Sequence, residues 1–184
     1  MLASCPTLIL VAHADAGDRN LWTDDQDLRP LSDLGRRQAA NIAAGVGAVD
    51  GVFSSPARRC SETVAPIATT SGLEIVEMDD LRELPYAVEH RAWEPWGASM
   101  ADFVLSATGV GRIMRAVTAV ADRVPTGRTA VCAHGDLVPM FAAFAATALG
   151  VPLPDPVARG GWFEIDFLGP NAGVRAEGAL LPKP

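Results

Sequence analysis

The sequence predicts an α/β protein with three layers, α/β/α, around a mostly parallel central sheet. Short apolar runs alternate along the chain with segments of helical periodicity, and this alternation is typical of sheets built from strand–helix–strand units. The runs at residues 7–12 and 129–133 are almost wholly apolar, as expected of strands that are covered on both faces. Each of these two runs is followed at once by a histidine.

Length and composition narrow the classes of protein further. The 184 residues, 49% hydrophobic and 20% charged, fit one compact domain over residues 1–184. Acidic residues outnumber basic ones by 22 to 15, and the net charge of −7 has the wrong sign for a chain that wraps nucleic acid or coats an anionic membrane. Three cysteines without CxxC spacing favour a reducing compartment. We expect a cytoplasmic protein that binds neither nucleic acid nor membrane.

Start and stop signals place the elements of the first half. Ser32 is a favoured residue just before a helix, and glycines follow the last apolar position of the segment that it opens. Pro56 suits the first turn of a second helix. The expected elements are a strand at residues 7–12, a helix at 32–46, a strand at 49–53, a helix at 57–69 and a strand at 73–78.

The second half begins with a segment that lacks clear periodicity. Residues 79–108 are rich in Pro, Trp, Glu and Gly, and a loop of this length inside a compact domain is usually functional. We expect a lid or a substrate-side insertion there, with a short helix at 100–105. The remaining expected elements are a helix at 110–124, a strand at 129–133, a helix at 137–149 and strand-like pieces at 161–167 and 173–177.

Candidate functional residues follow the strands. In an open parallel sheet, ligands gather beyond the carboxyl ends of the strands, which here are residues 12–19, 54–59 and 133–136. His13 and His134 follow the two clearest strands, and Arg59 lies at the start of the helix that follows the strand at 49–53. A neutral imidazole can attack phosphorus while Arg and a second His neutralise the phosphoryl oxygens. This set favours phosphoryl transfer without a cofactor, because a two-histidine zinc site would lack a third ligand.

Four motifs, in order along the chain, resemble those of the histidine phosphatase, or phosphoglycerate-mutase-like, superfamily. They are LILVAHADA at residues 8–16, LRPLSDLGRRQA at 28–39, SSPARRCSET at 54–63 and VCAHG at 131–135. The short chain is similar to the compact SixA-type branch, and the stretch from His13 to Trp22 is similar to the phosphatase domain found behind a Nudix domain in some bacterial hydrolases. No Nudix box is present.

The resemblance implies a phosphoglycerate-mutase-like fold and a role for each matched residue. It makes His13 the phosphorylated nucleophile, Arg59 the phosphate-binding arginine and His134 the second histidine of the pocket. Ser55 and Gly135, from the same motifs, are expected to bind substrate. Family members often take a proton-donating acid from the segment after the third strand, where Glu83 is the candidate; an ordinary solvated carboxylate is the alternative.

One position departs from the family pattern. The family has arginine directly before the nucleophile, and this chain has Ala12. Losing one charge-assisted contact to the phosphoryl group typically costs about 2–4 kcal/mol in the transition state. Arg19, six residues after His13, is the candidate substitute if its loop folds back over the pocket; otherwise it is a surface or specificity residue.

These observations lead to one function and two alternatives. We expect a metal-independent phosphatase that hydrolyses a phosphomonoester or phosphohistidine through a phosphohistidine on His13, weakened by Ala12. A phosphate-binding or interaction module without turnover is the first alternative, and a phosphomutase is the second. The partner would be a small phosphorylated substrate or a phosphohistidine protein, with the oligomeric state left open between monomer and dimer. The residues expected on the substrate side are Tyr86, His90, Arg91, Trp93 and Trp96.

Overall fold

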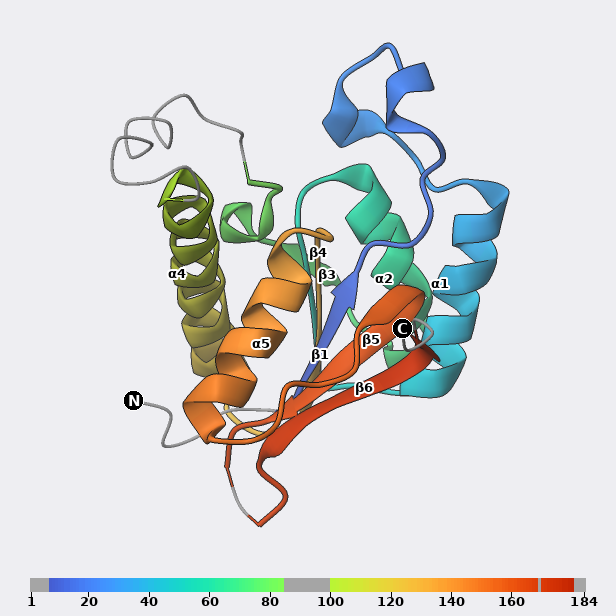
Figure 1. The fold of residues 1–184 in the computed structure, drawn as a ribbon. Coiled ribbons are helices and arrows are strands. Elements are labelled where there is room, and N and C mark those ends of the chain that lie inside the picture. Colours follow the sequence, from blue (N-terminus) through green and yellow to red (C-terminus); the bar gives the residue numbers. More distant parts are fainter. Residues whose placement is uncertain (1–6, 85–99, 169, 181–184) are drawn as a thin grey trace.

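A six-stranded sheet of order β3-β2-β4-β1-β5-β6 forms the centre of the molecule (Figure 1). The computed structural model describes residues 7–84, 100–168 and 170–180. Four neighbouring strands, β3, β2, β4 and β1, run parallel; β5 runs antiparallel to β1, and β6 runs antiparallel to β5. The strands are β1 (Thr7–Ala12), β2 (Gly51–Ser54), β3 (Ile75–Glu77), β4 (Arg128–Ala133), β5 (Val157–Asp166) and β6 (Gly173–Leu180).

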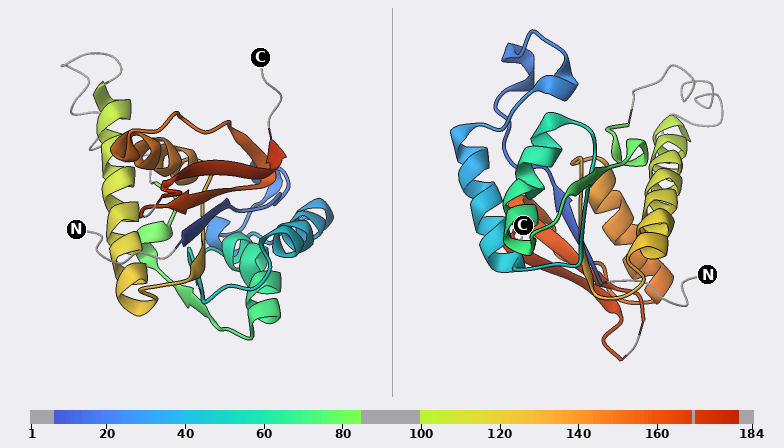
Figure 2. Two further views of the ribbon diagram at one scale, coloured as in Figure 1. Left: turned by 90° about the horizontal axis from the view of Figure 1, so that it is seen from below. Right: turned by 180° about the vertical axis from the view of Figure 1, so that it is seen from behind.

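Helices cover both faces of the sheet, which confirms the predicted three layers. Helices α1 (Asp33–Val46) and α2 (Arg58–Ser71) lie together on one face, and α4 (Met100–Arg123) and α5 (Leu137–Leu149) lie on the other (Figure 2). Short 3-10 turns complete the described part: η1 (Arg19–Leu21) and η2 (Gln26–Leu28) in the loop after β1, and η3 (Asp79–Leu81) after β3. Ser32 caps α1 by accepting from the Gly35 amide, as expected.

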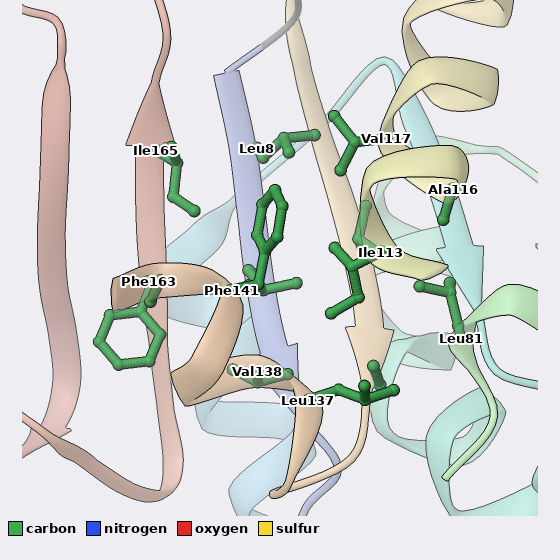
Figure 3. Packing of buried hydrophobic residues seen from close by; sticks show 14 of the residues in the cluster. Leu8, Leu81, Ile113, Ala116, Val117, Leu137, Val138, Phe141, Phe163 and Ile165 are labelled. Carbon is green, nitrogen blue, oxygen red and sulfur yellow. The ribbon is translucent and has the colours of Figure 1, made fainter. Parts of the chain in front are cut away.

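The alternation of side chains along β1 divides the core between the two layers. Ile9 and Val11 belong to the cluster beneath α1 and α2, whereas Leu8 and Leu10 belong to the larger cluster beneath α4 and α5. Figure 3 shows side chains of α4, α5, β1 and β5 meeting in the larger cluster. Because all four of these β1 side chains are fully buried, β1 is the two-sided strand that its continuous apolar sequence predicts.

The region between residues 100 and 124 differs from the prediction. A single helix, α4, runs through both segments that we expected as a short helix and a separate one. Gly109 lies in its middle and is buried; a Cβ atom there would come within 2.8 Å of Leu84 and 3.0 Å of Leu137. Glycine therefore serves close packing of α4 on its neighbours instead of ending the helix.

Helix α4 is also long and apolar enough to cross a membrane, judged by length and composition alone. Core helices of water-soluble proteins have the same property, so one such helix is weak evidence for a membrane span. Here Ile113, Ala116, Val117 and Val120 lie on one face of α4 and pack into the larger core cluster. The periodicity of these buried positions is that of an amphipathic helix lying on a sheet.

Two glycines of α4 provide a matched stability test. Replacing Gly111, which is exposed and has open space around its Cβ position, with Ala should raise the free energy of unfolding by about 0.5–1 kcal/mol through helix propensity. Gly109→Ala should lower it by about 1–3 kcal/mol because the methyl group overpacks the contact with Leu84 and Leu137. Urea unfolding of both variants measures the difference. An equal rise in the free energy of unfolding of both variants would show that Gly109 is not packed closely against Leu84 and Leu137.

Candidate active site

The carboxyl ends of three parallel strands bring the expected residues to one edge of the sheet. His13 follows β1 and Ser55 follows β2, while His134 follows β4. The backbone amides of His13 and Ser55 continue the sheet by donating to Ala133 and Cys132 at 3.0 and 2.9 Å. The two imidazole rings lie edge to face, with centroids 5.5 Å apart. The sequence prediction that both histidines share one crevice agrees with this geometry.

His13 is buried at the end of β1 and has two neighbours at the same ring nitrogen. Its Nδ1 lies 2.8 Å from the backbone oxygen of Ala14 and 2.9 Å from Nη1 of Arg159. A carbonyl only accepts and a guanidinium only donates, so one Nδ1 cannot bond both. The same Nη1 also donates to the backbone oxygens of His13 and Ala14, at 3.0 and 3.3 Å. Its two hydrogens satisfy these carbonyls, which leaves Nδ1–H to donate to Ala14 and a lone pair on Nε2.

Arg59, from the first turn of α2, is the most deeply buried charge of the site, with 1% of its side chain exposed. Its Nη1 donates to the backbone oxygen of Gln26 at 2.6 Å, and its Nη2 contacts Glu83 Oε2 at 3.0 Å and His134 Nδ1 at 3.2 Å. The buried Nε has no partner in the described part of the chain. A buried N–H without a partner is costly, and an anion could satisfy it.

His134 forms a hydrogen bond with Arg59 through one ring nitrogen and with Ser55 through the other. Because arginine donates, Nδ1 of His134 accepts from Arg59, and Nε2 then carries the proton and donates to Ser55 Oγ at 2.9 Å. The thiol of Cys60 lies 3.7 Å from the same Nε2. In this arrangement His134 orients the buried guanidinium; direct binding of the phosphoryl group by His134 stays a prediction.

Glu83 lies at the pocket and bridges two arginines. One carboxylate oxygen accepts from Arg59 and the other from Arg19, each at 3.0 Å, with 37% of the Glu83 side chain exposed. Glu83 is therefore a partner of the buried guanidinium rather than an isolated solvated carboxylate. Arg19 is 56% exposed, and among the described residues its guanidinium bonds Glu83 and not His13.

Hydrogen bonds from the two helices of one layer fix the loop that carries the nucleophile. The amide of Ala14 donates to Thr63 Oγ1 at 3.0 Å, and the amide of Asp15 donates to Gln38 Oε1 at 2.8 Å. The first turn of α1 presses against this loop at Gly35, where a Cβ atom would lie 1.9 Å from the backbone oxygen of Asp15. The Gly and Gln of the second motif thus act by positioning the loop after His13.

Burial and positive charge keep both histidines neutral. Desolvation, together with the charges of Arg159, Arg59 and Arg29, lowers the pKa of His13 to about 3 despite its bond to Ala14. Desolvation and the charge of Arg59 are the main causes that lower the pKa of His134 to about 2. Burial and the neighbouring arginines also lower the pKa of Arg29. The protein as a whole is acidic, yet this pocket is a local concentration of positive charge.

Two pocket arginines were not predicted as site residues. Arg29 lies in the second motif and is buried, and its Nη1 donates to the backbone oxygens of Ala16 and Gly17 at 3.0 and 3.1 Å. Arg159 comes from the other end of the chain. A signal for it exists, since Arg159 is followed by two glycines inside an otherwise strand-like segment, a pattern that marks a bulge.

The remaining predicted positions vary in where they lie. Gly135 lines a cavity beside the pocket together with Ala12 and Arg159. Arg58, next to Arg59, is exposed and pairs with Glu62 on the helix surface. The predicted substrate-side residues between 86 and 96 lie outside the described residues. Within the described residues, no group of three His, Cys, Asp or Glu side chains is placed to hold a metal ion.

Comparison with known proteins relates this geometry to a family. A curated 8-oxo-(d)GTP phosphatase from Mycolicibacterium smegmatis is 32% identical over 88 residues, which are 47% of this chain and 27% of that protein. Among solved structures, Bacillus stearothermophilus YhfR is 19% identical with a TM-score of 0.69, over 96% of this chain and 98% of its own. A phosphoglycerate mutase from Bacillus anthracis is 16% identical with a TM-score of 0.66, over 96% and 93%. These two likenesses confirm the predicted fold.

The family assignment comes from the sequence profile. Residues 8–104 match the model of the histidine phosphatase superfamily, branch 1. This match spans more than half of the chain and contains three of the four motifs, including His13 and Arg59. The chain therefore belongs to the histidine phosphatase superfamily.

Proposed function

We propose that the protein is a metal-independent phosphatase that hydrolyses a phosphomonoester or a phosphohistidine. The observation that carries the proposal is a neutral, buried His13 beside the buried Arg59, whose Nε lacks a partner in the described residues. A neutral imidazole is nucleophilic, and an unsatisfied guanidinium N–H suits a phosphoryl oxygen. Family membership supports the same class of reaction.

The reaction has two steps. In the first, Nε2 of His13 attacks phosphorus and forms a P–N bond while the P–O bond to the leaving group breaks. Arg59 and the other pocket donors neutralise the phosphoryl oxygens as charge develops. In the second step, water attacks phosphorus and gives up a proton to a carboxylate of the pocket, the P–N bond breaks, and inorganic phosphate and free His13 result. The Nδ1–H bond to Ala14 orients the ring so that Nε2 is the attacking atom.

Glu83 is the proposed donor of the proton that the leaving oxygen needs. Its two carboxylate oxygens each accept from an arginine, so the role requires the incoming phosphate to replace Glu83 on Arg59. The released carboxylate oxygen takes up a proton from water and passes it to the leaving oxygen. The competing proposal is a module that binds phosphate without turnover. Measuring phosphate binding and turnover of the wild type and of His13→Ala distinguishes this module from a phosphatase.

Brief reaction of the wild type with a ³²P-labelled phosphomonoester, followed by denaturation in alkali, should trap label that is stable to alkali and labile to acid. The label should map to His13, and His13→Ala should abolish both the label and turnover. Phosphate binding by His13→Ala with no turnover in the wild type would instead support the binding module. Label on Ser54, Ser55 or Cys60 would show that the nucleophile is wrong.

Chelation should leave turnover unchanged, because guanidinium groups handle the phosphate charge. The measurement is kcat/KM for a generic phosphomonoester before and after dialysis against EDTA. A loss that added divalent ions restore would contradict the assignment to Arg59 and its neighbours.

Both histidines should remain neutral where an ordinary histidine titrates. Imidazole ¹⁵N shifts of His13 and His134 should show no protonation from pH 8 to 5, since their pKa values are about 3 and about 2. Unfolded histidines take up protons near pH 6.5, so the free energy of unfolding should fall as pH drops below that value, by about 1.4 kcal/mol per pH unit for each histidine at most. His13→Gln should weaken this dependence. Titration of His13 near pH 6.5 would refute the buried neutral nucleophile.

A further inference from the structure

The contact between Arg159 and the nucleophile joins positions 146 residues apart. Strand β5 runs antiparallel to β1, so its beginning lies beside the end of β1, where His13 follows. Every hydrogen bond of Arg159 to the strand end uses the single nitrogen Nη1. Its Nε and Nη2 make no hydrogen bond within the described ranges, and Arg159 is exposed at the pocket. These are donors next to His13 that remain available to an oxyanion.

A bulge in β5 directs this side chain. The pairing of β5 with β6 shifts register between Val157 and Gly161, and Gly160 in the shifted stretch has φ +98. Bulges bend a strand and re-aim a side chain, often beside active sites. Gly160 suits the positive φ because other residues rarely adopt it. The backbone oxygen of Arg159 is in turn bound at 3.0 Å by Gln38 Nε2.

Gln38 ties Arg159 to the nucleophile loop. Its amide oxygen accepts from Asp15 and its amide nitrogen donates to Arg159, so one side chain of α1 bridges the loop after His13 and the bulge. The bulge, the Gln38 bridge and the carbonyl contacts of Nη1 each restrict where the guanidinium can lie. A group held by three separate features is preorganised, and preorganised donors stabilise developing charge most effectively.

Ala12 and Arg159 share one cavity. It measures about 240 Å³ and is lined mainly by apolar residues of β5 and the start of α5. A longer side chain at position 12 would enter this space and approach the same end of β1. An arginine placed at position 12 would therefore bring its guanidinium to the same end of β1 that Arg159 reaches from β5.

We propose that Arg159 is a phosphate-binding residue, which supplies from the β5 bulge the guanidinium that position 12 does not carry. The proposal rests on the phosphatase function proposed above and assigns to that site a residue distant from its motifs. Arg159 donates through Nε and Nη2 to phosphoryl oxygens while Nη1 stays on the carbonyls of His13 and Ala14. The phosphate site then has a guanidinium in place of the one that position 12 lacks, so Ala12 does not imply weak turnover.

The test moves the guanidinium from one strand to the other. Arg159→Met, which keeps an unbranched side chain without charge, should lower kcat/KM for a phosphomonoester by roughly 10- to 1000-fold. Ala12→Arg should change the wild type little, but in the Arg159→Met background it should recover at least tenfold. Arg175→Met, a change on β6 at an arginine paired with Asp166, is the control and should leave kcat/KM unchanged. Thermal melts check that each variant folds.

A second readout does not depend on turnover. The Kd for inorganic orthovanadate, measured by calorimetry, should rise at least tenfold in Arg159→Met and return toward the wild-type value in the double variant. If the wild type binds vanadate but hydrolyses neither a phosphomonoester nor a phosphohistidine peptide, the proposed function fails while this binding series still decides the role of Arg159. A Kd and kcat/KM within twofold of wild type in Arg159→Met would overturn the proposal. So would an equal gain from Ala12→Arg in both backgrounds.

Discussion

The site depends on one positive charge that is held almost entirely away from water. A buried guanidinium costs several kcal/mol unless hydrogen bonds and an opposite charge compensate it. Arg59 obtains this compensation from the Gln26 carbonyl, from Glu83 and from a ring nitrogen of His134. Each of these partners must stay in place, so the loop after β1, the turn after β3 and the end of β4 are all tied to the first turn of α2.

The same buried charge adds to desolvation, the larger cause, in keeping the histidines neutral. Protonating His134 would put a cation beside Arg59 in a desolvated pocket, and Nδ1 would lose the lone pair that accepts from the guanidinium. His13 sits among three arginines under similar conditions. Nucleophile and phosphate-binding charge are therefore coupled, because the cations that attract a phosphoryl group add to desolvation in keeping the attacking nitrogen unprotonated.

Local signals made most of the fold and half of the site predictable. His13, Arg59 and His134 each follow an apolar strand that is legible in sequence, and parallel strands deliver their carboxyl ends to one edge. Arg159 was missed because its position beside His13 depends on the antiparallel pairing of β5 with β1 and on the bulge in β5. No sequence pattern near His13 indicates either feature. The break expected between residues 105 and 110 was wrong for a related reason: the close packing that Gly109 permits is recognised only when its neighbours are known. The role of Arg19 could not be read because its partner, Glu83, is 64 residues away.

The glycine at the first turn of α1 has a consequence for how this sequence can change. A Cβ atom at position 35 would overlap the main-chain oxygen of Asp15, only two residues after the nucleophile. Since every amino acid has that oxygen, no replacement at position 15 can make room for a side chain at 35. The two positions touch, yet they should show no covariation among homologues, because 35 is closed to all but glycine whichever residue that retains the loop stands at 15.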